Sequence, residues 1–385
     1  MAPKNDFMRQ IFLGTLLLFH IRGYAQEIQL DRQEINSLSD LEKEENYHTK
    51  DEIIDRLLKD KTDAEVIYLP GNQQQQMLHN EQYLHANHNN LYTIKYEMEE
   101  SATVKKYSNG QLSQDKKVVI SGVFYTLSED GVILHIDAGH GGASTYTFYS
   151  SNLEITSEYK PYPHGIQEDQ FDSNGRIIAI LSKERVNSPK AKISVLDLAG
   201  RLISEKEIDA SGFSISDIKI ADNNIVVLLT KLGSIGSRVG YYDNNLNLRW
   251  ERNFTTGVSR YRIIANKEVG SVVLNATGKI RCFSESGEMI WSIDPSVISG
   301  RMSHERLTVG GNFVFDNKYV GIAIGNVSGA FEVTDNRIYL IDMKTGQIVY
   351  TDEVRSSKTA LDVLSGSSGF YVLSSDKVLR YAGAK

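Results

Sequence analysis

Residues 282–291 read CFSESGEMIW, and residues 339–350 read YLIDMKTGQIVY. Each stretch joins two short runs of β-favouring residues through a polar turn that contains a glycine. Two β runs joined by a polar or glycine turn recur at four other places in the chain, namely 104–112, 147–155, 193–203 and 241–250. Each of these stretches therefore predicts a β-hairpin.

The hairpins recur at a nearly constant interval. Their turn residues stand at positions 110, 152, 200, 245, 287 and 346, so the intervals are 42, 48, 45, 42 and 59 residues. A second series of turns alternates with the first, at 89, 131, 175, 224, 270, 317 and 369, with intervals of 42, 44, 49, 46, 47 and 52. Two hairpins in each period of about 47 residues give four short antiparallel strands, which is the unit of a β-propeller blade.

We therefore predict an all-β, seven-bladed propeller over residues 64–385, built from four-stranded antiparallel blades. Six blades would require discarding the first period, and eight would require a hidden repeat in the 59-residue interval. The last period has a third strand at 378–381 but no fourth strand after it. A free sheet edge invites aggregation, so we expect an N-terminal strand at 64–70 to complete this blade.

An aromatic residue follows the turn glycine by four positions in both quoted hairpins, as Trp291 after Gly287 and Tyr350 after Gly346. On this pattern, most of residues 90–385 resembles the repeats of the PQQ-like and YVTN/WD40-like propellers. Ser204 stands where the aromatic residue would follow Gly200, and the chain has no series of Trp-Asp pairs. The resemblance implies the fold alone, because such propellers include hydrolases, lyases, dehydrogenases, assembly factors and inert scaffolds.

Residues 1–25 have the pattern of a secretory signal peptide. Lys4 and Arg9 precede an apolar run at 11–19, and the small residues Gly23 and Ala25 precede Gln26. Such a run is too short to span a bilayer comfortably. We expect cleavage near Ala25 and an exported, periplasmic or extracellular protein with no membrane span.

Residues 26–63 form an acidic segment, with 12 acidic against 6 basic side chains. Two capping-box patterns, at 39–42 and 49–52, predict helix starts, and the second leads into apolar residues on one helical face. We expect a short amphipathic helix at about 50–60 that lies on the outer wall of the ring.

The composition, 41% hydrophobic and 24% charged, is that of a folded globular protein. Cys282 is the single cysteine and lies in an alternating β run, so we expect a buried, unreactive thiol and no internal disulfide. We expect a monomer without a nucleic-acid partner.

One face of the predicted ring is basic. The loops that enter each blade's first strand and join its second and third strands sum to a charge of about +6, and the opposite turns to about −6. We therefore take the loop face as the candidate ligand-binding face. Its candidate residues are His140, His164, Arg185, Lys231, Arg260, Arg301 and His304.

No residue pattern predicts a catalytic or metal site. The chain has no His-Glu-x-x-His motif, no serine in a nucleophile elbow and no pair of cysteines. His79, His85 and His88 lie close together, and we interpret them as part of a solvated hairpin turn rather than as metal ligands. The repeat pattern alone supplies no ligand set for a PQQ cofactor, and we expect no cofactor.

Three functions remain open. The leading hypothesis is a non-enzymatic, exported binding module or scaffold for a protein or an anionic glycan on the loop face. The second is a polysaccharide lyase or hydrolase that uses His140, His164 or His304 as a base. The third is an envelope-assembly scaffold of the PQQ-like type, which would need a protein partner and show no glycan affinity.

Overall fold

The computed structural model describes residues 28–383 with interruptions. The interruptions are 37–40, 42–43, 45–46, 59–64, 70–72, 78–80, 88, 98–100, 120–121, 139–143, 164–165, 167, 222, 234–235, 255–260, 267–269, 276–279, 295–306, 317, 328–332, 355–360, 368 and 375–376. The predicted signal peptide at 1–25 lies outside the described residues.

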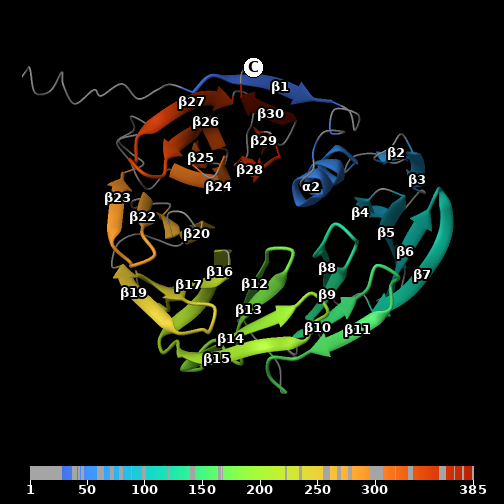
Figure 1. The fold of residues 1–385 in the computed structure, drawn as a ribbon, viewed down its shortest axis with the longest axis horizontal. Helices are drawn as coiled ribbons and strands as arrows, with labels where there is room; N and C mark the ends of the chain where they lie inside the picture. Colours follow the sequence, from blue (N-terminus) through green and yellow to red (C-terminus); the bar gives the residue numbers. More distant parts are fainter. Residues whose placement is uncertain are drawn as a thin grey trace, which may run out of the picture.

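The described residues form seven four-stranded antiparallel sheets, which we number as blades 1 to 7 and which are arranged in a ring (Figure 1). Blade 1 contains β4 (Gln82–Asn87), β5 (Asn90–Glu97), β6 (Ser101–Ser108) and β7 (Gln111–Val119). Blade 2 contains β8 (Gly122–Thr126), β9 (Ile133–Ala138), β10 (Ser144–Tyr149) and β11 (Ile155–Tyr159). Blade 3 contains β12 (Glu168–Ser173), β13 (Ile177–Lys183), β14 (Lys190–Asp197) and β15 (Leu202–Asp209).

Blade 4 contains β16 (Phe213–Ala221), β17 (Asn224–Lys231), β18 (Ser237–Tyr242) and β19 (Leu248–Phe254). Blade 5 contains β20 (Tyr261–Asn266), β21 (Gly270–Asn275), β22 (Ile280–Phe283) and β23 (Met289–Ile293). Blade 6 contains β24 (Leu307–Phe315), β25 (Tyr319–Val327), β26 (Val333–Asp342) and β27 (Ile348–Val354). Blade 7 contains β28 (Asp362–Ser365), β29 (Gly369–Leu373), β30 (Val378–Gly383) and the N-terminal strand β1 (Leu30–Ile35).

The predicted propeller of four-stranded blades closed by an N-terminal strand is confirmed, but the predicted closing strand is wrong. Blade 7 is completed by β1, which pairs antiparallel with β30 from Leu30 opposite Gly383 to Ile35 opposite Val378. Segment 64–70 instead contains β2 (Glu65–Leu69), which pairs with β3 (Gln73–Met77) in a separate two-stranded hairpin. An outer edge strand does not need the apolar residues that favoured 64–70, because its side chains remain largely in water.

The turns between third and fourth strands explain the period of the sequence. Each places a residue in the left-handed region, at Gly110, Leu153, Gly200, Leu246, Gly287 and Gly346 in blades 1 to 6, and blade 1 adds Asn109. Glycine adopts this conformation without a steric penalty. The turn residues chosen from sequence agree with these positions to within one residue, because this chemistry is local.

A tryptophan of the preceding blade packs against two of these glycines, Gly287 and Gly346. The indole N–H of Trp250 donates to the Glu285 carbonyl at 3.1 Å, and that of Trp291 to the Met343 carbonyl at 2.7 Å. A Cβ atom on Gly287 would lie 2.6 Å from Cγ of Trp250. The aromatic residue four positions after the turn therefore packs against the glycine turn of the next blade.

We predict that Gly287→Ala lowers the free energy of unfolding by about 2–4 kcal/mol, since it adds overpacking against Trp250 to the cost of a positive φ. Gly212→Ala is the matched control, because Gly212 has a similar φ of 74° with nothing within 4 Å of its added Cβ. Urea unfolding of both variants measures the difference. Equal losses would show that the Trp250 contact contributes nothing.

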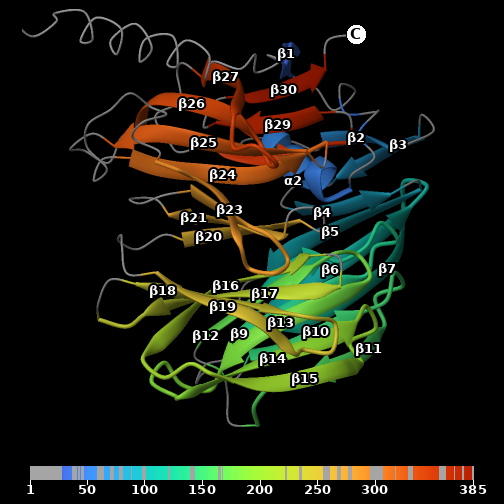
Figure 2. The ribbon, with the colours of Figure 1, turned by 60° about the vertical axis from the view of Figure 1, so that its left-hand side comes forward.

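The helix α2 (Tyr47–Leu58) fills the place between the first and last blades. Its Ile53 and Ile54 belong to one apolar cluster with Leu91 of blade 1 and Tyr371 of blade 7. The six other clusters lie between consecutive blades. Figures 1 and 2 both place α2 between β4 and the strands of blade 7. The predicted position on the outer wall is therefore wrong, although the predicted helix is present.

We predict that Ile53→Ala lowers the free energy of unfolding by about 2–5 kcal/mol, because Ile53 is fully buried in the wedge between the end blades. Ile203→Ala provides a control of identical chemistry, since Ile203 is 58% exposed on an outer strand. The midpoint of urea unfolding is the measurement. A cost as small as that of Ile203→Ala would contradict a tightly packed wedge.

Candidate functional site

The polar side of α2 faces a cavity at the centre of the ring. Asp51, Glu52 and Asp55 of α2 line a hollow of about 750 Å³. The rest of its wall comes from blade 1, the innermost strands β8 and β12, and Lys219 of β16. We call this hollow the axial cavity. The helix therefore has two functions, because its apolar face closes the ring while its acidic face lines the centre.

Carboxylates dominate the charge of the axial cavity. Asp51, Glu52, Asp55 and Asp172 line it, against the single lysine Lys219. Lys219 is already 3.5 Å from Asp172 and 3.7 Å from Asp217. Burial raises the pKa of Glu52, and the nearby carboxylates of Asp362, Asp51 and Asp55 raise it further. A cation in the cavity would relieve this repulsion.

Aromatic rings form the rest of the recognition surface of the axial cavity. Tyr96 and Tyr125 line it and are 44% and 38% exposed. Tyr125 meets Phe171 edge to face, with ring centroids 4.7 Å apart. Exposed rings beside carboxylates suit an organic cation, which interacts with the ring face and with the negative charge together.

A buried histidine holds the helix in place. His85 is fully buried, and its Nδ1 lies 2.6 Å from the Asp51 carboxylate. Its Nε2 lies 3.1 Å from the Glu129 carbonyl, so the ring connects α2 to blade 2. The Tyr83 hydroxyl also donates to Asp51. The predicted solvated turn is therefore wrong for His85, while His79 and His88 lie outside the described residues.

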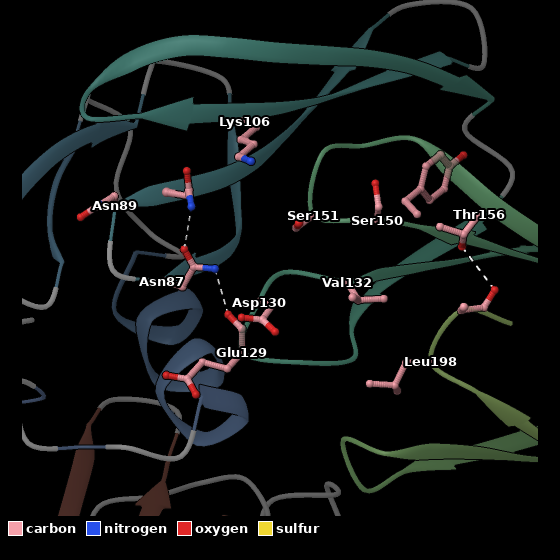
Figure 3. A pocket seen from close by; sticks show the side chains of 13 residues that line it. Asn87, Asn89, Lys106, Glu129, Asp130, Val132, Ser150, Ser151, Thr156 and Leu198 are labelled. Carbon is pink, nitrogen blue, oxygen red and sulfur yellow. Dashed lines mark hydrogen bonds between the residues drawn. The ribbon is translucent and has the colours of Figure 1, made fainter.

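A second hollow lies on the opposite side of His85, among the turns of blades 1 to 3 (Figure 3). It has a volume of about 680 Å³. Its wall comes from the β4–β5 turn at 87–90, the β8–β9 turn at 129–132, the β10–β11 turn at 150–151 and the β14–β15 turn at 198–199. We call it the turn-face pocket.

Two of the candidate residues from sequence, Arg185 and Lys231, belong to the part of the chain that the structure describes, and neither lines the axial cavity or the turn-face pocket. Arg185 and Lys231 are exposed on the loop face, Arg185 after β13 and Lys231 at the end of β17. His140, His164, Arg260, Arg301 and His304 lie outside the described residues. The grouping of the seven residues on one face therefore stays a prediction.

The predicted loop-face charge includes Lys183, Lys190 and Arg238, and none of these three side chains is a free surface charge. Lys183 is fully buried, and its ammonium donates to the carbonyls of Val186, Ala210 and Phe213. Lys190 pairs with Glu207 at 2.5 Å, and Arg238 with Asp209 at 3.2 Å. Burial lowers the pKa of Lys183. The predicted charge total is therefore wrong in treating Lys183 as a surface base.

The described residues show no group of three or more His, Cys, Asp or Glu side chains that could hold a metal ion. Cys282 is fully buried as predicted, and burial raises the pKa of its thiol to about 12. A thiol with so high a pKa is a poor nucleophile. Within the same part of the chain, no helix is long and apolar enough to cross a membrane.

Comparisons with known proteins found similarity to solved structures and no match in sequence. No protein-family model matches the sequence, and no curated protein matches it. Among solved structures, the chain is similar to BamB from Moraxella catarrhalis, with 12% identity and a TM-score of 0.49 over 84% of this chain and 95% of that chain. It is also similar to a eukaryotic initiation factor, with 13% identity and a TM-score of 0.47 over 76% of this chain and 65% of that chain.

The acidic face of α2 was missed because the helix was placed on the outer wall. A signal for it was present in the sequence. Asp51 and Asp55 stand four residues apart and therefore share one face of the helix. An inward position of the helix would have predicted a central acidic surface.

We predict that stability falls as the pH rises from 10 toward 12. Burial, then Asp51 and Glu129, raise the pKa of Tyr47 from 10.0 to about 12, and burial, then Asp130, raise that of Tyr92 to about 12. Their contribution is complete below the unfolded value of 10.0 and is lost as the pH rises through the folded value.

Urea unfolding across this pH range measures the fall, and ultraviolet absorbance follows phenolate formation. The double variant Tyr47→Phe/Tyr92→Phe should lose less stability over the same interval than the unchanged chain. Tyr96→Phe, at an exposed ring, serves as the control. An unchanged slope in the double variant would contradict the assignment.

Proposed function

We propose that this propeller is a non-enzymatic binding module that receives a basic segment of a protein partner in its axial cavity. The observation that carries the proposal is the single wall that joins the α2 carboxylates to the exposed rings of Tyr96 and Tyr125. A lysine or arginine side chain satisfies both elements at once, through charge and through the ring face. Since residues 1–25 predict export, the partner would be an exported protein.

The position of the cavity also supports a segment of a partner chain. Ligands of repeat folds of this kind bind where the inner elements converge, and here β4, β8 and β12 converge on one hollow. The helix contributes the exposed carboxylates of Glu52 and Asp55, which match basic residues spaced along an extended chain. An envelope-assembly scaffold would be one form of this function.

The ligand of this function is cationic and binds in the axial cavity, whereas the sequence alone favoured an anionic ligand on the loop face. Arg185 and Lys231 are the two members of the loop-face set that the structure describes, and they are exposed. Polyanion binding that is lost in Arg185→Ala/Lys231→Ala would favour the loop face. Affinity for a basic peptide favours the axial cavity.

We predict that a fluorescent decalysine peptide binds the full chain and that Glu52→Gln/Asp55→Asn weakens its binding about tenfold, since two lining carboxylates are lost. Fluorescence anisotropy at physiological salt is the measurement. Tyr125→Ala should also weaken binding, by about threefold, with no change in net charge.

The matched control is Glu285→Gln/Glu288→Gln, which removes the same net charge from an exposed turn of blade 5. It should leave the affinity within about twofold, because surface charges at that distance are screened. Equal weakening by both double variants would reduce the binding to a net-charge effect. Absence of peptide binding to the unchanged chain would refute the proposal.

A further inference from the structure

We propose that the turn-face pocket binds a neutral saccharide of two or three sugar units. This site is separate from the axial cavity and from the loop face, so the inference does not depend on the proposed function. The volume of about 680 Å³ lies within the range of small-molecule sites. Figure 3 shows its labelled side chains on several different turns around one hollow.

The polar groups of the pocket suit a ligand rich in hydroxyl groups. Asn87, Asn89, Asn90, Ser150, Ser151 and Thr156 line it, and each of these side chains can both donate and accept hydrogen bonds. A sugar hydroxyl has the same dual character, with one donor and two acceptor lone pairs. The carboxylates of Glu129 and Asp130, both exposed, add acceptors that can take two neighbouring hydroxyl groups.

Part of this polar wall is fixed before a ligand arrives. Asn87 donates to the Glu129 carbonyl at 2.9 Å, and Asn90 donates to the side-chain oxygen of Asn87 at 3.0 Å. The Ser108 hydroxyl donates to the side-chain oxygen of Asn90 at 2.8 Å. Because these amides are held by their neighbours, a ligand would lose less free energy in ordering them.

The same wall disfavours anionic ligands. The pocket is lined by the two carboxylates of Glu129 and Asp130 and by the ammonium group of Lys106. The Lys106 ammonium already donates to the side-chain oxygen of Asn152 at 3.0 Å. Burial also lowers the pKa of Lys106. A phosphate, a nucleotide or an acidic glycan would therefore meet repulsion.

The apolar groups are few and small. Val132, Leu198 and Ala199 line the pocket, and its tyrosine, Tyr149, is only 6% exposed. Among its described lining residues, the pocket thus offers no exposed large ring for stacking a base or a drug-like aromatic group. The apolar side chains of Val132, Leu198 and Ala199 suit the C–H face of one pyranose ring, while the amides and carboxylates of the pocket can bind the hydroxyl groups at the edge of that ring.

The test uses the full chain with cellobiose, maltose and N,N′-diacetylchitobiose as probes, and digalacturonate as the anionic comparison. Isothermal titration calorimetry and saturation-transfer NMR measure binding. We expect at least one neutral disaccharide to bind, and digalacturonate to bind at least about tenfold more weakly.

The double variant Asn89→Ala/Asp130→Asn should weaken binding about tenfold or more, since it removes two polar lining groups. The matched control Asn244→Ala/Glu285→Gln changes the same kinds of groups on exposed turns of blades 4 and 5 and should leave affinity unchanged. Circular dichroism confirms that each variant is folded. Decalysine affinity should be the same in both, which separates this site from the axial cavity.

Three results would overturn the inference. They are no binding of any neutral disaccharide to the folded chain, an affinity that Asn89→Ala/Asp130→Asn leaves unchanged, or tighter binding of digalacturonate than of every neutral probe.

Discussion

The contact between the two ends of the repeat is the constraint on which the other features depend. Blades 1 and 7 are joined through α2, whose Ile53 and Ile54 belong to the same apolar cluster as Leu91 and Tyr371. The strand β1 completes blade 7 just before the helix in the sequence, and its Ile35 lies in that cluster too. Ring closure therefore combines a sheet pairing at the outer edge with a helix near the centre.

Placing a helix at this interface also decides what the centre of the ring can bind. A strand-to-strand interface would present alternating side chains to the axis. The helix instead presents Asp51, Glu52 and Asp55, and His85 fixes its position by bonding Asp51 on one side and the Glu129 carbonyl on the other. The acidic character of the axial cavity is thus a consequence of how the ring is closed.

The repeat could be predicted from the sequence because its determinants are local. Gly287 and Trp291 are four residues apart, and a left-handed turn position favours glycine whatever surrounds it, although leucine occupies it in blades 2 and 4. The closing strand could not be predicted in the same way, because β1 reads LDRQEI and has little of a strand's usual apolar content. Its place is set by pairing with β30, far away in the sequence.

The site was harder to predict, because charges find their partners across strands. Lys190 pairs with Glu207 on the neighbouring strand, and Lys183 is enclosed by carbonyls from connecting segments. Neither the pairing of Lys190 nor the enclosure of Lys183 can be recognised from the amino-acid sequence alone. The prediction favoured the loop face because of loop histidines such as His140 and His304. The axial cavity is instead lined by a helix and inner strands, and the turn-face pocket by turns.

The pairing of Leu30 with Gly383 has a consequence for biosynthesis. The ribosome makes β1 among the first residues of the ordered ring and its partner β30 among the last, so β1 stays without its partner during nearly all of translation. A chain without β30 would leave β1 unpaired in the same way, even though every other blade had already been synthesised. The closure of blade 7 by β1 therefore waits for the synthesis of β30.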